Sequence, residues 1–310
     1  MTRSPVILGL DFGGTKIAMA ICDQSGNRVA DTVLATEAEA GAASAFERAI
    51  AAARELLLTA APGAELVAVA AATFGIPFDD RVELAPAIPG WESLPFGHEL
   101  RAAFPDVRLC MATDVKAAAL AELRWGALAG ADPAIYLNLG TGLATAIVAG
   151  GKVVNGAHGA AGEIGYNLRE PADVGRPNSE RLTLEDVVSG KALAEIARAE
   201  LGRRLSTAEL FDLAETDDGA ARIVESFIRE LAQHVVNLAV AVDPARIAVG
   251  GGLARSWSVL APVLRGALDA AVPYPPELVL AAFPFDAPLI GALALGVEAA
   301  AAVLGEGALR

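Results

Sequence analysis

Two glycine-rich corners, each directly after an apolar run, constrain the fold of this chain more than any other feature. The first is Gly13-Gly14-Thr15, behind the run at 6–10, and the second is Gly140-Thr141-Gly142, behind the run at 134–139. Glycine lets the chain turn sharply and leaves backbone N–H groups accessible, because no Cβ atom stands in front of them. Each corner therefore predicts a turn between two strands whose N–H groups can bind a phosphate.

Strands and helices are expected throughout the chain from hydrophobic periodicity and turn signals. The strands are expected at 6–10, 16–22, 28–34, 66–72, 107–111, 134–139, 143–149, 247–249 and 278–281. The helices are expected at 44–58, 98–104, 114–125, 184–201, 207–213, 220–242, 253–268 and 289–304, and Thr113 is expected to be the N-cap of the third. Both halves begin with strands bent at a corner and continue with helices, which indicates an old duplication.

This pattern predicts an α/β protein of two lobes with a cleft between them. The small lobe is expected to take residues 1–113 and to regain the last helix at 289–310. The large lobe is expected to take residues 114–288.

Composition excludes some partners. The chain has 24 basic and 38 acidic residues among 310, a net charge of −14, and nucleic-acid binding needs a basic face instead. No uncharged apolar run reaches the length of about 18 residues that a membrane span needs, so no membrane partner is expected. The two cysteines, Cys22 and Cys110, are far apart, which favours a reduced, cytoplasmic location.

Two familiar phosphate motifs do not fit the first corner. A P-loop ends in Gly-Lys-Ser/Thr, whereas Gly14 is followed by Thr15 and Lys16 in the opposite order. The Asp-Phe-Gly of protein kinases is present at 11–13, but no catalytic loop or strand lysine precedes it. A plain hairpin turn explains either corner alone. Both corners together with a third cluster, Gly250-Gly251-Gly252, favour nucleotide binding.

Seven segments, taken in order, resemble the ROK sugar kinases, which belong to the actin–hexokinase superfamily. The segments are LGLDFGGTKIAMAI, APAIPGW, TDVKAAALAE, LNLGTG, GAHGAAGEIGY, AVGGGLARS and APLIGALALG. The resemblance covers nearly the whole chain. It implies the two-lobed actin-like ATPase fold, related to ribonuclease H, and a glucokinase-like activity that phosphorylates a hexose or aminosugar with ATP and Mg²⁺. It also implies a homodimer.

The resemblance assigns roles to particular residues. Asp114 matches the catalytic base, although a carboxylate at a helix start also stabilises the helix dipole. Asp11 matches an aspartate that lies near Mg²⁺, through water. The implied nucleotide-binding residues are Asp11, Gly13, Gly14, Thr15, Lys16, Gly140, Thr141, Gly142, Gly250, Gly251 and Gly252. The implied sugar-binding residues are Thr113, Asp114, Glu163, Tyr166 and Glu185.

The chain departs from the family at its zinc site. In zinc-bearing members a histidine follows the GEIG segment, and three cysteines precede a glutamate. Here Tyr166 replaces the histidine, while Arg176, Asn178 and Thr183 stand at the cysteine positions. No zinc is therefore expected, and charged residues of the segment 168–181 are expected to hold this loop. Glu185 falls on the glutamate but could instead be a first-turn helix acid.

Two amides of the family's sugar site are also replaced. The family's Asn-Asp pair is Thr113-Asp114, and the asparagine of its NLPGW-like loop is Ala87. A pocket that loses polar partners binds a polyhydroxyl ligand more weakly, or binds another one. A catalytically weak or inactive sugar-sensing regulator is therefore the alternative. No DNA-binding domain is expected, because the first strand begins within a few residues of Met1.

Overall fold

The computed structural model of the 310-residue chain describes residues 4–307. The chain forms two compact units. Unit 1 contains the residues up to Arg124 and those from Asp286 onward, and unit 2 is Trp125–Phe285. Within the described residues, no helix is long and apolar enough to cross a membrane. The α/β fold class expected from the sequence is confirmed.

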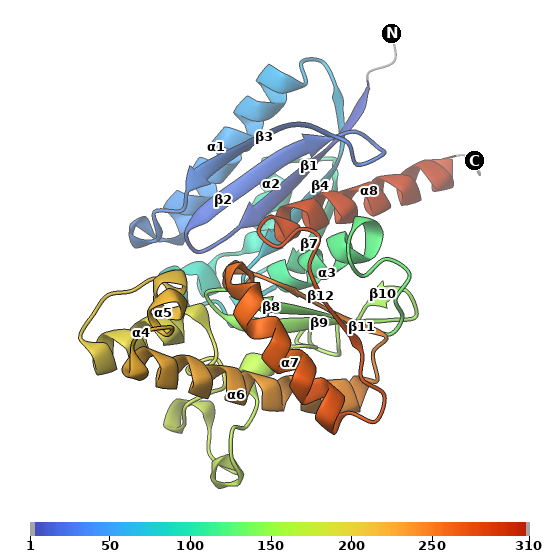
Figure 1. The fold of residues 1–310 in the computed structure, drawn as a ribbon. Helices are drawn as coiled ribbons and strands as arrows, with labels where there is room; N and C mark the ends of the chain where they lie inside the picture. The colour runs from blue at the N-terminus through green and yellow to red at the C-terminus, as the bar shows by residue number, and fades with distance from the viewer. Residues whose placement is uncertain (1–3, 308–310) are drawn as a thin grey trace. The chain divides into compact units, whose positions relative to one another are not determined.

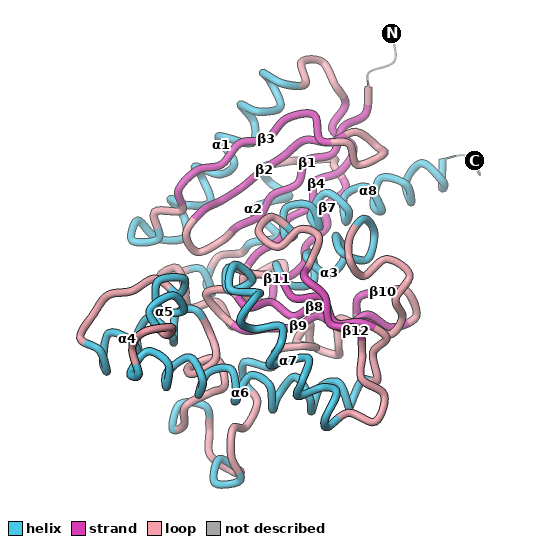
Figure 2. Tube along the Cα trace, viewed as in Figure 1, coloured by secondary structure: helices cyan, strands magenta, loops and turns pink. Residues whose placement is uncertain are grey.

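Unit 1 is built on a five-stranded sheet (Figures 1 and 2). Its order is β3 (Arg28–Ala35), β2 (Lys16–Cys22), β1 (Pro5–Phe12), β4 (Glu65–Thr73) and β7 (Arg108–Thr113). Strands β1, β2 and β3 form an antiparallel meander, whereas β1, β4 and β7 run parallel. The carboxyl ends of these three parallel strands therefore meet at one edge of the sheet.

Helices cover both faces of this sheet, which explains why β1 is an almost continuous apolar run. Leu8 and Leu10 pack in one cluster with α1 (Gly41–Ala60) and α2 (Phe96–Ala103). Ile7, which points to the opposite face, packs in another cluster with residues of α8 (Ala287–Gly307). Each face of β1 is thus buried by a different part of the chain.

Helix α3 (Asp114–Trp125) lies in unit 1 up to Arg124, although the sequence division assigned it to the large lobe. Helix α8 holds it there. A Cβ atom added at Gly291 of α8 would come within 1.8 Å of the carbonyl oxygen of Ala117, so the two backbones touch. Ala72, Ala117 and Ala292 form a small buried cluster at this crossing. Small residues on both helices are what lets α3 pack with unit 1.

Short elements complete unit 1 between β4 and α2. They are β5 (Ile76–Pro77), β6 (Val82–Glu83) and the 3₁₀ turn η2 (Trp91–Ser93), and a further turn η1 (Ala38–Ala40) precedes α1. Trp91 is fully buried among Phe12, Phe74 and Phe96. Its Nε1 donates to Thr73 Oγ1 at 3.1 Å, so the indole anchors the segment 85–91 to the end of β4.

Unit 2 repeats the same sheet topology. Its order is β10 (Lys152–Val153), β9 (Leu143–Ala149), β8 (Ala134–Leu139), β11 (Arg246–Gly250) and β12 (Glu277–Leu280). Strands β8, β9 and β10 form the antiparallel meander, and β8, β11 and β12 run parallel. The third, second, first, fourth and fifth strands of each unit therefore lie in the same order, which supports the duplication.

Four helices supply the apolar core of unit 2 against this sheet. They are α4 (Gly190–Leu201), α5 (Thr207–Leu213), α6 (Asp218–Val242) and α7 (Trp257–Ala271). The 3₁₀ turns are η3 (Ile164–Tyr166), η4 (Pro171–Asp173), η5 (Asn178–Glu180) and η6 (Gly252–Ser256). The helix expected at 184–201 begins six residues later than expected, because Thr183 and Asp186 form a separate turn and Ser189 caps α4.

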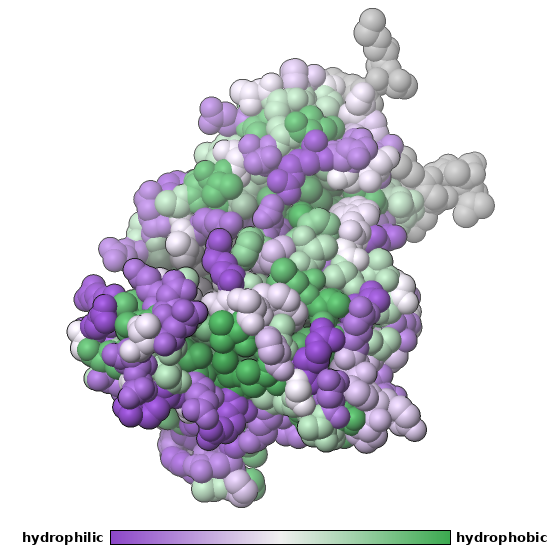
Figure 3. Space-filling view, viewed as in Figure 1, coloured by the Kyte–Doolittle hydropathy of each residue, from purple (hydrophilic) through white to green (hydrophobic). Residues whose placement is uncertain are grey.

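An apolar groove of about 840 Å³ lies between α5, α6 and α7 of unit 2 (Figure 3). Ile228, Val236 and Val263 are among the residues that line it. Its lining includes none of the residues that the sequence assigns to nucleotide or sugar, so the candidate site lies elsewhere.

Candidate functional site

The parallel strands of unit 1 bring the predicted acidic residues to one edge of the sheet. Asp11 pairs with Ala72 across β1 and β4, and Thr73 pairs with Thr113 across β4 and β7. Asp114 follows Thr113 directly, as the first residue of α3. Asp11 and Asp114 are thus two acidic groups at the same end of the parallel strands β1 and β7, which flank β4, and α/β proteins commonly place their ligands at this end.

Asp114 is half-buried at the start of α3. The hydroxyl of Thr113 accepts the N–H of Lys116 at 3.2 Å, so Thr113 caps the helix, as its position before the apolar run predicted. Asp114 Oδ1 accepts the N–H of Val115 at 2.8 Å. Thr113 is 4% exposed and its hydroxyl is engaged in the cap, which makes it a poor sugar contact. Asp114 keeps a fixed backbone position and a partly accessible carboxylate.

Asp11 is the most perturbed carboxyl group of this edge. Burial, together with the negative charge of Asp114, raises the pKa of Asp11 to about 7. Lys16 lowers it in part and Asp286 raises it further. A cation beside Asp11 would relieve this repulsion, and carboxylate oxygens are ligands that Mg²⁺ accepts in proteins. The residues present therefore fit a magnesium ion at this edge.

The first corner lies beside these acids, between β1 and β2. Gly13 N–H donates to the carbonyl of Lys16 at 3.0 Å and closes the turn. In the described part of the chain, the N–H groups of Gly14 and Thr15 donate to no protein acceptor. A Cβ atom at Gly14 would meet only the Cβ of Ala87, at 3.6 Å. The corner thus presents two accessible donors, which suit a phosphate.

The second corner, in unit 2, is held from behind by helix α4. Gly190 N–H donates to the carbonyl of Gly140 at 2.9 Å, and Lys191 N–H donates to the carbonyl of Thr141 at 3.2 Å. In a trans peptide the C=O and the following N–H point in opposite directions. The N–H groups of Thr141 and Gly142 therefore point away from α4, and across residues 4–307 they donate to no protein acceptor.

Glu185 ties this corner to the segment that carries Glu163 and Tyr166. Its Oε2 accepts the N–H of Leu143 at 2.7 Å, and its own N–H donates to the carbonyl of Gly165 at 3.0 Å. A Cβ atom at Gly142 would lie 2.4 Å from that carboxylate oxygen, so a side chain there would displace the Glu185 carboxylate. Glu163 is half-buried, and Tyr166 is exposed. Unit 2 thus brings the second corner and the predicted sugar carboxylate Glu185 into contact.

The three glycines at the end of β11 have different roles. A Cβ atom at Gly250 would meet the Tyr136 hydroxyl at 2.2 Å, and Gly251 has a φ of 88° with its N–H bonded to the Pro284 carbonyl. These two positions require glycine for packing and conformation. A Cβ atom at Gly252 would meet nothing within 4 Å. Gly252 is therefore the member of the cluster with room for a ligand.

The family model of the ROK family matches residues 7–299 of the chain. The chain belongs to the ROK family.

Relatives and solved structures agree with this assignment. The kanosamine kinase of Amycolatopsis mediterranei is 31% identical over 275 residues, which is 86% of each chain. The structure of a ROK hexokinase from Thermus thermophilus has a TM-score of 0.78 at 30% identity and covers 94% of this chain and 98% of its own. A ROK family glucokinase from Streptomyces griseus, in complex with glucose and AMPPNP, has a TM-score of 0.75 at 26% identity and covers 94% and 99%. The fold is that of the actin-like ATPases.

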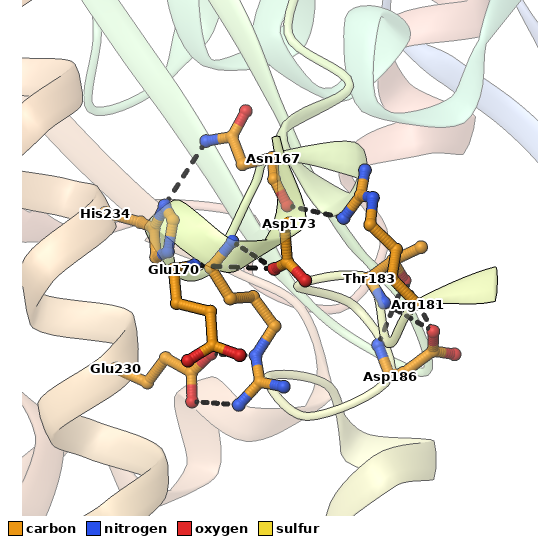
Figure 4. Close-up of polar contacts among 9 residues, drawn as sticks. Asn167, Glu170, Asp173, Arg181, Thr183, Asp186, Glu230 and His234 are labelled. Carbon is orange, nitrogen blue, oxygen red and sulfur yellow. Dashed lines mark hydrogen bonds and ion pairs between the residues drawn. The ribbon is translucent and has the colours of Figure 1, made fainter. Parts of the chain in front are cut away.

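Arg181 holds the loop in which zinc-bearing ROK proteins place their metal (Figure 4). Its guanidinium donates to the carbonyl of Tyr166 at 2.7 Å, to the carbonyl of Asn167 at 3.2 Å and to Asn178 Oδ1 at 2.6 Å. Among residues 4–307, no group of three or more His, Cys, Asp or Glu side chains could hold a metal ion. The absence of zinc stays a prediction, which elemental analysis of the purified protein tests.

Further polar contacts fasten the same loop to helix α6. Arg169 pairs with Glu230, and Asn167 Nδ2 lies 3.3 Å from His234 Nδ1. Burial lowers the pKa of His234, which favours the neutral ring. The charged residues expected to hold this loop, Arg181 among them, do so. The sequence did not identify the carbonyls of Tyr166 and Asn167 as acceptors of Arg181, because backbone carbonyls leave no trace in the sequence.

We expect Asp11→Asn to stabilise the protein above neutral pH. The ordinary pKa of this group is 3.8 and its folded value is about 7, so the folded state binds a proton that the unfolded state releases between these values. Stability is therefore lost as the pH rises through this range. The variant should exceed the parent's free energy of unfolding by about 1–4 kcal/mol near pH 8, with a smaller difference near pH 5. Thermal denaturation at the two pH values measures this, and a variant less stable than the parent near pH 8 contradicts it.

Proposed function

We propose that the protein transfers the γ-phosphoryl group of ATP to a hydroxyl of a hexose or aminosugar, with Asp114 as the general base. The observation that carries the proposal is the edge of the sheet in unit 1, where the accessible amides of the first corner lie beside the acids Asp11 and Asp114. The kinase names of the ROK relatives support the reaction class.

The backbone donors proposed to bind phosphate oxygens of ATP are the N–H groups of Gly14 and Thr15 in the first corner and those of Thr141 and Gly142 in the second corner. Gly252 leaves room for the rest of the nucleotide. Asp11 would hold Mg²⁺, through water, and the ion would supply positive charge that neutralises the phosphates. Lys16, at the start of β2, adds a positive charge near the same oxygens.

In the proposed reaction, Asp114 accepts the proton of a sugar hydroxyl as its oxygen attacks the γ-phosphorus. The new O–P bond forms while the bond to the β-γ bridging oxygen breaks, and ADP leaves with that electron pair. The α3 cap at Thr113 holds the base in place. Glu163, Glu185 and Tyr166 of unit 2 are proposed to bind the sugar hydroxyls, since a carboxylate accepts from two hydroxyls at once.

A second candidate function is supported by the altered sugar residues. Ala87 is exposed where the family pattern has an amide, and the hydroxyl of Thr113 is engaged in the helix cap. A pocket with fewer polar partners would suit a sugar-sensing protein with weak or no turnover. A screen of hexoses and aminosugars in a coupled ADP-release assay separates the two functions. A sugar that raises the melting temperature without being phosphorylated favours the sensor.

The homodimer implied by the family stays a prediction, which sedimentation analysis of the purified protein tests.

Gly14→Val should weaken ATP–Mg binding by about 10-fold or more, because a branched side chain would stand before two phosphate donors. The position has room for it, since only Ala87 is nearby. Gly140→Val makes the same change in unit 2. Gly266→Val is the control, because a Cβ atom on this α7 glycine meets nothing within 4 Å and Gly266 belongs to neither corner. Calorimetry measures the affinities, and unchanged binding in both folded corner variants would refute the two-corner proposal.

Asp114→Asn should lower turnover by about 100-fold or more while ATP still binds, because the amide cannot accept the proton. The amide oxygen can still accept the Val115 N–H, so the start of α3 is preserved. Glu163→Gln is the comparison. It should raise the KM for sugar more than it lowers kcat, since it removes a binding contact. Near-normal kcat in Asp114→Asn would reduce this carboxylate to a structural role.

Ala87→Asn should lower the KM for the sugar by about 3- to 10-fold, the scale of one added hydrogen bond. The side chain is exposed and lies beside the first corner, so an amide there has space. Ala87→Leu has a similar size without the polar group and should not lower the KM. Equal effects of the two variants on KM would show that side-chain volume, not hydrogen bonding, acts at this position.

A further inference from the structure

Thr36 lies directly behind the first corner and is completely buried. Its hydroxyl donates to the carbonyl of Gly13 at 2.6 Å, and its own N–H donates to the carbonyl of Thr15 at 3.0 Å. One residue therefore holds the two carbonyls on either side of Gly14. Thr36 follows β3 and is 21 residues from Thr15 in sequence, so no motif of the corner includes it.

The hydrogen bond to the Gly13 carbonyl fixes the direction of the Gly14 N–H. Because the peptide bond is planar and trans, the Gly14 N–H points opposite to the Gly13 carbonyl, away from Thr36. The Gly13–Gly14 peptide has glycine on both sides, so little else prevents it from rotating. If it rotated, the carbonyl oxygen would take the place of the N–H at the phosphate. The Thr36 hydroxyl stabilises the orientation in which the N–H is presented.

Helix α1 fixes Thr36 in turn. Arg48 donates to the carbonyl of Thr36 and, at 3.0 Å, to the carbonyl of Ala35. Its Nη1 also lies 3.3 Å from the carboxylate of Glu37. Glu37 has a φ of 51°, a left-handed conformation that is unfavourable for this residue type. The guanidinium therefore clamps three successive residues, including a strained one, and keeps Thr36 against the corner.

In unit 2 the carbonyls of the corner are held by backbone N–H groups and not by a side chain. There the N–H groups of Gly190 and Lys191 donate to the carbonyls of Gly140 and Thr141. In both units the carbonyls of the corner are bound from behind, and the intervening N–H groups have no protein acceptor in the described chain. Recurrence in two units with unrelated donors indicates that the arrangement serves the corner and is not a by-product of one local sequence.

We infer that Thr36 is a positioning residue for nucleotide binding, which orients the Gly14 amide of the first corner toward a phosphate, with Arg48 holding it in place. The inference rests on the proposed function, since it requires the first corner to bind ATP. It predicts that the Thr36 hydroxyl affects ATP affinity without touching ATP.

The test compares variants of the full chain by calorimetry with ATP–Mg and by steady-state kinetics. Thr36→Val keeps the shape and removes the donor, and ATP–Mg binding should weaken by about 10-fold, the effect of one lost hydrogen bond. Thr36→Ser keeps the donor and should restore affinity to within about 2-fold of the parent. Thr32→Val makes the same substitution on β3, opposite Met19 and away from the corner, and should bind ATP as the parent does. The KM for sugar should not change in any of the three.

Arg48→Met provides a second route, because it removes the clamp but leaves Thr36 and the corner intact. It should weaken ATP–Mg binding, even if Thr36→Val does not fold. Parent-level ATP affinity in folded Thr36→Val, or in Arg48→Met, would overturn the inference. An equal rise in the KM for ATP and for sugar would also overturn it, as that is the result of general loosening. A parent protein that binds no ATP–Mg would refute the proposed function and, with it, the inference.

Discussion

The planar peptide bond connects the back of each corner to its front. A carbonyl that is hydrogen-bonded behind the corner fixes the N–H of the next residue to point the other way. Thr36 provides this bond for Gly13, and Gly190 provides it for Gly140. The donors proposed to bind phosphate are thus set by residues that never approach the ligand. The corner is only as rigid as the structure that binds its carbonyls.

The two units have the same strand order but support their corners differently. In unit 1 the support is a buried side chain clamped by an arginine, Thr36 and Arg48. In unit 2 it is the start of helix α4 together with the carboxylate of Glu185. A helix start offers N–H groups without intrahelical partners, which makes it a ready donor for such carbonyls. The repeated topology therefore preserves the position of the corner, while the surrounding groups have diverged.

Much of the fold could be predicted because strands buried on both faces are apolar runs bounded by turns. The runs near 6–10 and 134–139 are β1 and β8 of the structure. The predicted start of α4 was wrong. Leu184 and Val188 continue the helical spacing of apolar residues, but the helix begins only at Gly190, after its N-cap Ser189. Of the site, the glycine corners and the Thr113 cap could be read from local spacing, whereas the acids were assigned by the resemblance to the ROK kinases. The roles of Thr36 and of Arg181 toward particular acceptors could not be read from the sequence, because both act on carbonyls 14 to 23 residues away, which any residue type provides.

The groups proposed to bind phosphate and those proposed to bind sugar are of different kinds. Backbone N–H groups bind phosphate in the proposal, and a substitution alters them only by adding a Cβ atom or freeing a carbonyl. The residues proposed to bind the sugar act through side chains, which can be replaced one at a time, as the family's residues are at Ala87 and Tyr166. The loop after Tyr166 is also held by side chains. Arg181 holds this loop with several hydrogen bonds worth about 1 kcal/mol each. Loss of any one of these contacts leaves the others in place, so this loop can change its sequence without losing its structure, whereas the corners cannot.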